Sequence, residues 1–185
     1  MNLFAVDYDP VKAAQALPDK HVVKMCVENA QMLAVAVGPL HGYGWGHIRK
    51  KDGSFYSEKA HFNHPSTKWV RARHANTAWA IVHGLALCHE YMGRYGKTHA
   101  AVIAHLDAAR LFKTYVGYLS KWEEAEEFAR AMPDYIKNDQ SIGSVEAYRK
   151  YVIEHKPWAT WKDESRKPTW WTLSVAAKID TSISA

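Results

Sequence analysis

The sequence is poor in cysteine and has no long uninterrupted hydrophobic stretch. Its two cysteines, Cys26 and Cys88, both lie in apolar sequence of helical character. We therefore expect two buried thiols in a reducing compartment and no disulfide. No window approaches the roughly 18 apolar residues of a membrane span, and the first residues lack the pattern of an export signal. These absences favour a soluble, cytoplasmic protein.

Several catalytic signatures are missing as well. The sequence contains neither a Walker A loop nor a dinucleotide-binding glycine motif, and no Gly-x-Ser-x-Gly elbow. Neither cysteine has the polar, electropositive setting that a nucleophilic thiol requires. Ordinary hydrolase, kinase and dehydrogenase functions are therefore disfavoured, and no cofactor is expected.

Histidines are common, but their spacing does not predict a metal site. His61 and His64 stand three residues apart, with His41, His47 and His74 in the flanking sequence. A pair at this spacing can bind a metal, yet no carboxylate stands at ligand spacing nearby, and no Cys-x-x-Cys or His-Glu-x-x-His occurs. We expect His64, directly before Pro65, to cap a helix or line a cleft.

The chain carries a formal charge of +5, and it contains 8 Trp and 10 Tyr. A moderate basic excess is compatible with a partner that bears phosphate. Aromatic rings interleaved with Lys and Arg suit stacking on exposed bases, although core packing explains any single ring equally well.

Helix signals dominate the first third of the chain, and no convincing strand pair appears. Asp9-Pro10 opens a short helix, which Pro18 breaks, and a long helix then runs from Asp19 to Gly38-Pro39. Residues 38–65 are rich in glycine and lack periodicity, which predicts a long irregular loop of the kind that is usually functional or mobile.

The rest of the chain continues in the same manner. We expect a helical region from Pro65 to about Tyr95 with a kink near His74, a helix over 98–119, and a helix over 144–155. Between the last two lies a short helix with an acidic patch: Glu123, Glu124, Glu126 and Glu127. A Trp-rich irregular segment follows Pro157. The prediction is an all-α fold with one domain over 1–178 and a flexible tail over 179–185.

The most informative segment is the start of the long helix. At 100° per residue, its polar side chains fall on an arc of about 100°, and they are Lys20, His21, Lys24, Glu28 and Gln31. The remaining arc is apolar and includes Val23 and Val27, so the helix should lie inside the fold with one narrow polar seam. A lone carboxylate between a histidine and a lysine is a candidate for acid–base or electrostatic work. The alternative is that the seam simply meets solvent.

Two groups of cations are candidates for contact with nucleic acid. Lys68 and Arg71 share a helix face, and Arg73, Arg94 and Lys97 follow them in sequence. A solvated helix face explains this first group equally well. The second group places two cations beside two rings that can stack on bases, and it consists of Arg166, Lys167, Trp170 and Trp171.

These motifs resemble a known family. Asp19-Lys20-His21, with Glu28 seven residues after the histidine, is similar to the early helix of the phage-type pyrimidine-dimer DNA glycosylase/lyases, the endonuclease V-like family. Lys167-Pro168-Thr169-Trp170-Trp171 resembles the C-terminal run of that family. The helical middle, from His64-Pro65 to Gly96, is similar in layout.

The resemblance implies a compact helical enzyme that binds duplex DNA and forces out a nucleotide. An N-terminal α-amine, here on Met1, would attack the sugar C1′, release the base through an imine and allow β-elimination. Glu28 would stabilise the cationic sugar and shuttle protons, and His21 matches the histidine that opens the family helix. Lys24, Gln31 and His64 complete the expected nucleic-acid-binding set.

The sequence also departs from the family pattern. The family nucleophile is a threonine exposed by removal of the initiator methionine, whereas Asn2 is too bulky for that removal. Met1 should then remain, and its long side chain would crowd an attack on C1′. Val27 and Gln31 stand where the family has arginines.

Two functional hypotheses follow. The first is a DNA glycosylase/abasic-site lyase that acts on a damaged or modified pyrimidine. The second is a non-catalytic binder of DNA or of a free signalling nucleotide, in which the loop and the tail tryptophans close over the ligand. If the protein is phage-encoded, it would work in the host-cell cytoplasm. The sequence leaves the target base and the oligomeric state open.

Overall fold

The computed structural model describes residues 1–174, and over these residues the chain is all-α, as predicted. Its β structure in this range is one isolated bridge between Arg49 and Phe55. In chain order the elements are α1 (Pro10–Ala16), α2 (Asp19–Val37), α3 (Pro65–Ala72), α4 (His74–Tyr95), α5 (Val102–Tyr115), the 3-10 turn η1 (Leu119–Glu124), α6 (Asp134–Lys137), α7 (Ser144–His155) and the 3-10 turn η2 (Glu164–Arg166).

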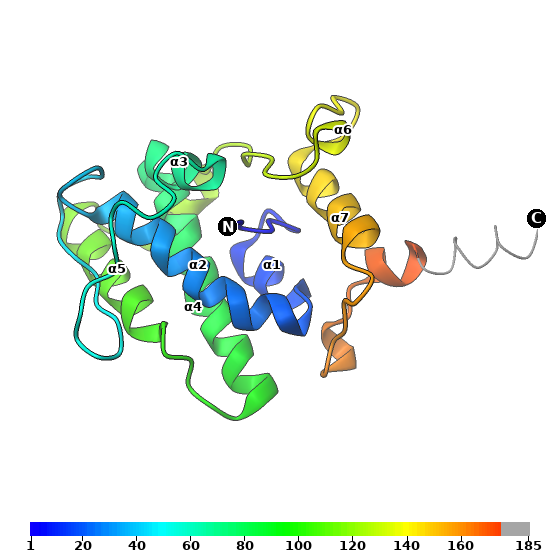
Figure 1. Cartoon of the computed structure of the whole chain (residues 1–185), viewed down its shortest axis with the longest axis horizontal. Helices are drawn as coiled ribbons and strands as arrows, with labels where there is room; N and C mark the ends of the chain where they lie inside the picture. The colour runs from blue at the N-terminus through cyan, green and yellow to red at the C-terminus, as the bar shows by residue number, and fades with distance from the viewer. Residues whose placement is uncertain (175–185) are drawn as a thin grey trace, which may run out of the picture.

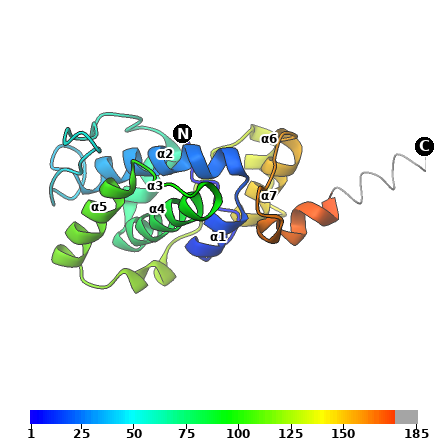
Figure 2. The same cartoon turned by 90° about the horizontal axis from the view of Figure 1, so that it is seen from below.

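Helix α4 is the centre of the packing. It contacts α1, α2, α3, α5 and η1, and the core forms between these elements. Figure 1 and Figure 2 show α6 and α7 on the other side of the N-terminal segment from α3 and α5. The first residues of the chain therefore run between two groups of helices, and residues 2–6 are all buried.

Local signals set the first helix boundaries as predicted. The Asp9 carboxylate accepts hydrogen bonds from the backbone N–H groups of Val11 and Lys12, and Pro10 takes the first helical position. Helix α2 begins directly after Pro18 and ends at Gly38. The expected kink near His74 is a full break, because Arg73 adopts an extended conformation between α3 and α4.

The polar seam of α2 differs from the helical-wheel prediction. Val23 and Val27 are 39% and 38% exposed, whereas His21 is only 4% exposed. The wheel fails here because the N-terminal segment covers the start of α2: the ring of Phe4 stacks on His21 with centroids 4.0 Å apart. Helical periodicity depends on one helix alone, so it cannot predict burial by a segment from another part of the chain.

Three further boundaries need correction. Helix α5 is shorter than expected, since it covers Val102–Tyr115. Glu126 and Glu127 lie beyond η1, in extended chain. The segment that holds Trp170 and Trp171 is helical over 169–174 and not irregular. The expected tail at 179–185 lies outside the described residues.

The long loop between α2 and α3 is irregular, as predicted, but it has contacts within itself and a contact to α5. Within the loop, buried Glu58 accepts a hydrogen bond from the Leu40 N–H at 2.6 Å and lies 2.8 Å from His47 Nδ1. Arg49 forms a two-pronged ion pair with Asp107 of α5, with nitrogen–oxygen distances of 2.8 and 2.6 Å. This ion pair holds the loop against α5.

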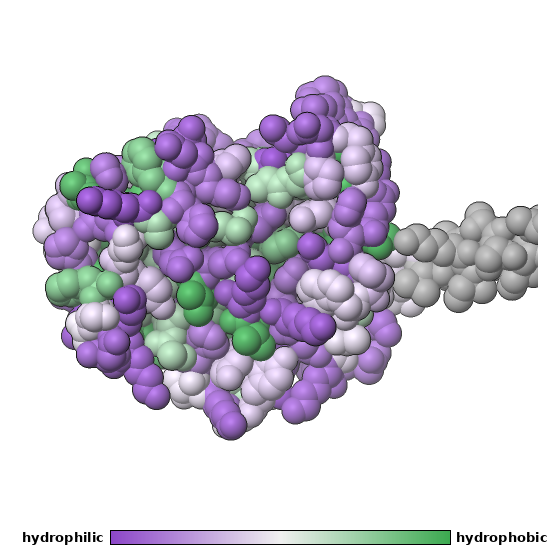
Figure 3. All heavy atoms as spheres, in the orientation of Figure 1, coloured by the Kyte–Doolittle hydropathy of each residue, from purple (hydrophilic) through white to green (hydrophobic). Residues whose placement is uncertain are grey.

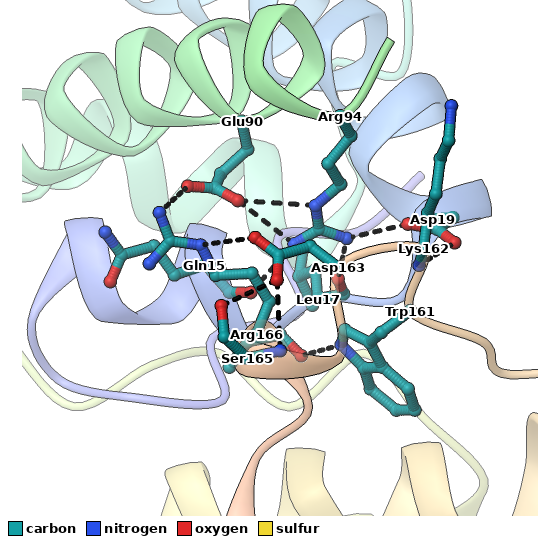
Figure 4. Close-up of polar contacts among 11 residues, drawn as sticks. Gln15, Leu17, Asp19, Glu90, Arg94, Trp161, Lys162, Asp163, Ser165 and Arg166 are labelled. Atoms are coloured by element: carbon teal, nitrogen blue, oxygen red, sulfur yellow. Dashed lines mark hydrogen bonds and ion pairs between the residues drawn. The ribbon is translucent and has the colours of Figure 1, made fainter.

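The deepest charge cluster surrounds Arg94 at the end of α4 (Figure 4). Its side chain is 2% exposed and pairs with Glu90 at 3.2 Å and with Asp19 at 3.0 Å. It also donates to the backbone carbonyls of Gln15 and Leu17, each at 2.8 Å. Arg94 therefore joins α1, α2 and α4 inside the protein. Its enclosure corrects the sequence-based placement of Arg94 in the nucleic-acid-binding set.

None of the helices in residues 1–174 is long and apolar enough to cross a membrane. The face in Figure 3 is mainly hydrophilic, with apolar residues in small, separate areas.

Replacing Arg94 with methionine should destabilise the protein by about 3–5 kcal/mol, because it leaves the buried Glu90 carboxylate short of its main cation. Urea unfolding at neutral pH measures this loss. Arg110→Ala is the matched control. Its side chain is 69% exposed and lies 3.8 Å from Asp107, so its loss should stay below about 1 kcal/mol. Equal losses in the two variants would contradict the structural role of Arg94.

Candidate active site

A cavity of about 380 Å³ lies where the N-terminal segment, the start of α2 and the end of α7 meet. This volume falls within the usual range of small-molecule and cofactor sites. The cavity is lined by Met1, Asn2, Phe4, Lys20, His21, Lys24, Met25, Glu28, Ala131, Tyr151, Lys156 and Trp158. Four of the five residues of the polar seam of α2, all but Gln31, therefore line a hollow.

Glu28 is the one carboxylate in this lining, and several donors converge on it. Its Oε2 atom accepts a hydrogen bond from the Asn2 backbone N–H at 2.8 Å and lies 3.7 Å from the Met1 amino nitrogen. Its Oε1 atom lies 3.1 Å from Lys24 Nζ. The side chain is 12% exposed. Glu28 is therefore fixed in place at the inner end of the cavity, beside a primary amine.

The side chain of Met1 does not fill the cavity. It is 1% exposed, and its sulfur accepts a hydrogen bond from Thr67 Oγ1 of α3 at 3.3 Å. The crowding expected from the sequence is therefore absent, because the thioether is buried against α3 while the amino group faces Glu28. The sequence could not indicate this direction, since it depends on a contact with α3.

Asn2 holds the N-terminus in this position. Its side-chain amide donates to the Ala131 carbonyl at 2.7 Å, and its Oδ1 atom accepts from the Phe4 N–H at 3.2 Å. Phe4 has a φ of 49°, a left-handed conformation that is costly for a residue with a side chain. This turn brings the Phe4 ring over His21.

His21 forms a buried, neutral part of the cavity wall. Its ring lies between Phe4 and the edge of Trp158, whose centroid is 5.1 Å away. Burial, followed by the nearby charges of Lys156 and Lys24, lowers the pKa of His21 to about 3. Its Nδ1 atom has no hydrogen-bond partner within the protein. His21 is thus a neutral part of the cavity wall and not a cation.

Sequence reasoning missed the opposite wall, which comes from the end of α7 and the following turn. Tyr151, Lys156 and Trp158 form it, and Lys156 Nζ lies 4.8 Å from the Tyr151 ring. Lys20 Nζ lies 5.1 Å from the Trp158 ring. Together with Lys24 these lysines make the mouth of the cavity cationic. The one available signal was the Lys156-Pro157-Trp158 run, which has no distinctive spacing to α2.

The other residues predicted on α2 and α3 lie outside the cavity lining. Gln31 is half-buried on α2, and Lys68 is exposed on α3. His64 caps α3 by accepting from the Ser66 N–H at 3.2 Å, as expected from its place before Pro65. Burial and the nearby Met1 amino group lower the pKa of His64. Arg71 donates to the Phe62 carbonyl at 2.7 Å and stacks on the Phe62 ring.

The C-terminal cation–aromatic group lines a second, separate cavity of about 480 Å³. Arg166, Lys167 and Trp170 belong to it, together with Lys12 and Arg149. Arg166 is partly engaged by Glu90, at 3.3 Å. Trp171 is buried, and its ring centroid lies 5.2 Å from that of Trp161. The structure therefore does not bring this group together with Glu28.

Metal-ligating residues converge at a place that the sequence did not indicate. Over residues 1–174, the group close enough to share an ion consists of Cys26, Cys88 and His99. His61 and His64 do not belong to it. The two cysteines are buried and free, as predicted.

Comparison with known protein families finds a match. Residues 1–104 match the model described as pyrimidine dimer DNA glycosylase, which covers more than half of the chain. The chain belongs to the pyrimidine dimer DNA glycosylase family. This confirms the family resemblance given by Asp19-Lys20-His21 and Glu28. Searches of curated proteins and of solved structures find no match.

Only part of the cavity lining lies within the residues that match the family. Met1, His21 and Glu28 lie within the matched residues, whereas Tyr151, Lys156 and Trp158 lie beyond residue 104. The side of the cavity with the amine and the carboxylate thus comes from the family segment. The aromatic and cationic wall opposite comes from a part of the chain outside the match.

The buried His21 should make stability depend on pH. Because its folded pKa lies below the unfolded value of 6.5, the unfolded chain binds the proton more readily. Its contribution, on the order of a few kcal/mol, is present above pH 6.5 and is lost as the pH falls toward 3. Urea unfolding between pH 7 and pH 4 measures this loss.

His21→Phe should reduce that pH dependence, and the remainder comes from other buried groups such as His83, whose pKa is lowered to about 4 by burial. The matched variant of exposed His41, His41→Phe, should keep the full dependence. Titration of the His21 ring by NMR gives an independent reading. A His21 pKa near 6.5 in the folded protein would contradict the buried neutral state.

Proposed function

We propose that this protein is a DNA glycosylase with an associated abasic-site lyase step, acting on a damaged or modified pyrimidine in duplex DNA. The observation that carries the proposal is the pairing of a primary amine with a fixed carboxylate in a cavity: the Met1 nitrogen lies 3.7 Å from Glu28 Oε2. Membership of the pyrimidine dimer DNA glycosylase family supports the same chemistry.

The reaction assigns separate tasks to these two groups. The unprotonated amine of Met1 attacks C1′ of an extruded nucleotide, the bond between C1′ and the base breaks, and the base leaves with the bonding electrons and takes up a proton. The sugar ring then opens to an imine between C1′ and the amine. Loss of a C2′ proton and departure of the 3′ phosphate complete β-elimination, and water hydrolyses the imine.

Glu28 acts by electrostatics and by proton transfer. A carboxylate beside C1′ stabilises the positive charge that develops on the sugar and on the imine nitrogen. It also accepts the proton that the attacking amine must lose. The Asn2 N–H and Lys24 hold both of its oxygens, so the carboxylate is oriented before substrate arrives.

The surrounding residues suit an extruded nucleotide. Base extrusion costs a few kcal/mol and least at a damaged site. Trp158 lines the cavity and is 37% exposed, so it offers a stacking surface for the base. Lys20, Lys24 and Lys156 at the mouth attract the flanking phosphates. Lys68 and Arg71 on α3 remain candidates for contact with the duplex.

Borohydride trapping tests the imine. The protein is incubated with labelled duplexes that carry an abasic site or a cyclobutane pyrimidine dimer, and an undamaged duplex serves as the control. We expect a covalent adduct on a damaged duplex, lost when the N-terminus is acetylated. Mass spectrometry of the purified protein verifies that Met1 bears the free amine. Absence of any adduct on the abasic duplex would overturn the imine mechanism.

Glu28→Gln should reduce base release and strand cleavage by at least a hundredfold while duplex affinity changes little, because the amide keeps the size of the side chain but not its charge. Glu123→Gln, at an exposed site on η1, is the matched control and should retain full activity. Full activity in the Glu28 variant would remove this residue from the mechanism.

A second candidate function is non-catalytic binding of DNA or of a free nucleotide in the same cavity. It is favoured by the aromatic and cationic wall, which lies outside the family match. The expected closure by the long loop finds no support, since residues 38–64 are absent from the lining. Salt dependence separates the two ligands: duplex affinity should fall steeply with salt, whereas binding of a mononucleotide should respond weakly.

A further inference from the structure

The two buried thiols lie face to face between the central helices. Cys26 is on α2 and Cys88 on α4, and their sulfurs are 3.8 Å apart. The third member of the group, His99, lies in the connection between α4 and α5. One ligand atom from each residue falls within 4.8 Å of the others. Helix α2, helix α4 and the connection after α4 therefore present metal-ligating atoms to one point.

The sulfur separation matches metal coordination. Zinc binds thiolate sulfur at about 2.3 Å with tetrahedral angles, which places two coordinating sulfurs about 3.8 Å apart. A disulfide requires about 2.05 Å between the sulfurs, so the two cysteines are not bonded to each other. The observed spacing thus already suits a bridging ion and does not suit a bond between the sulfurs.

The surroundings favour a fixed site. The His105 Nε2 atom lies 3.0 Å from the Cys26 carbonyl oxygen. The Tyr91 ring meets His99 edge-on, with centroids 4.7 Å apart, and so limits rotation of the imidazole. Cys26 and Cys88 are 0% and 5% exposed, whereas His99 is half-buried. The His99 side is therefore the more exposed side of the group.

We propose that Cys26, Cys88 and His99 form a zinc site that fastens α2 to α4 and to the start of α5. Two thiolates and an imidazole are a ligand set that zinc prefers, with water or another donor in the fourth position. Binding releases the two thiol protons to solvent, so no oxidant or reductant takes part. Cys26 lies two residues before Glu28 on α2, so the ion would stabilise the helix that carries this carboxylate.

Cobalt titration of the full chain tests the site. The reduced protein is stripped with a chelator and titrated with Co²⁺, while zinc in the untreated protein is measured by mass spectrometry. We expect one equivalent of Co²⁺ per chain, a thiolate-to-cobalt charge-transfer band and the intense visible bands of tetrahedral cobalt. Zinc should displace the cobalt, since it binds such sites more tightly.

Variants assign the ligands. His99→Asn should weaken Co²⁺ binding at least tenfold, because even partners outside the ligand shell change affinity by about 10–100-fold. His89→Asn is the matched control, since His89 is exposed on the same helix directly after Cys88, and it should bind like the parent protein. Cys26→Ser and Cys88→Ser should each abolish the charge-transfer band.

The unsubstituted protein decides the question if the cysteine variants fail to fold. Absence of zinc in the reduced protein together with absence of the tetrahedral cobalt spectrum would overturn the proposal. Oxidation of the stripped protein to an intramolecular disulfide, with no metal binding, would overturn it as well. None of these measurements depends on DNA cleavage, so the metal site and the glycosylase proposal can fail independently.

Discussion

The attachment of the chain's first residues to helix α2 is the contact on which the candidate site depends. The Asn2 N–H binds the Glu28 carboxylate, and the Asn2 side chain binds the Ala131 carbonyl in the segment that leads to α6. One residue thus aligns the N-terminal amine, the carboxylate and the second half of the chain. Without this attachment the cavity would lose one wall, and Glu28 would lose the donor that orients it.

Burial divides the charges near the cavity into two kinds. Arg94, Glu90 and Asp19 are enclosed and mutually paired, and they hold α1, α2 and α4 together. Lys20, Lys24 and Lys156 line the cavity mouth, where Lys24 is 69% exposed. A buried charge without its partner is costly, whereas exposed lysines can exchange water for phosphate at little cost. Cationic side chains therefore hold helices together around Arg94, whereas at the cavity they can meet an anion.

The sequence predicted well what depends on neighbouring residues. Asp9-Pro10, Pro18 and Gly38 set helix ends through local backbone chemistry, and His64-Pro65 marked a cap. It predicted poorly what depends on distant partners. The enclosure of His21 by Phe4, the capture of Arg94 by α1 and the wall formed by Trp158 all require knowledge of tertiary packing. The convergence of Cys26, Cys88 and His99 belongs to this second kind, because 62 residues separate the two cysteines.

The cavity is lined by residues from both the start of the chain and the region after α6, and this affects the order in which the protein folds. Met1, Asn2 and Phe4 are synthesised before helices α1 to α5, and Tyr151, Lys156 and Trp158 are synthesised after them. Contacts with such wide sequence separation are slow to form, because a long loop must close before they contribute. The nascent helices α1 to α5 can assemble around their own core earlier. The cavity is therefore completed after this core, so Met1 and Glu28 acquire their enclosing wall only once the end of α7 has been made.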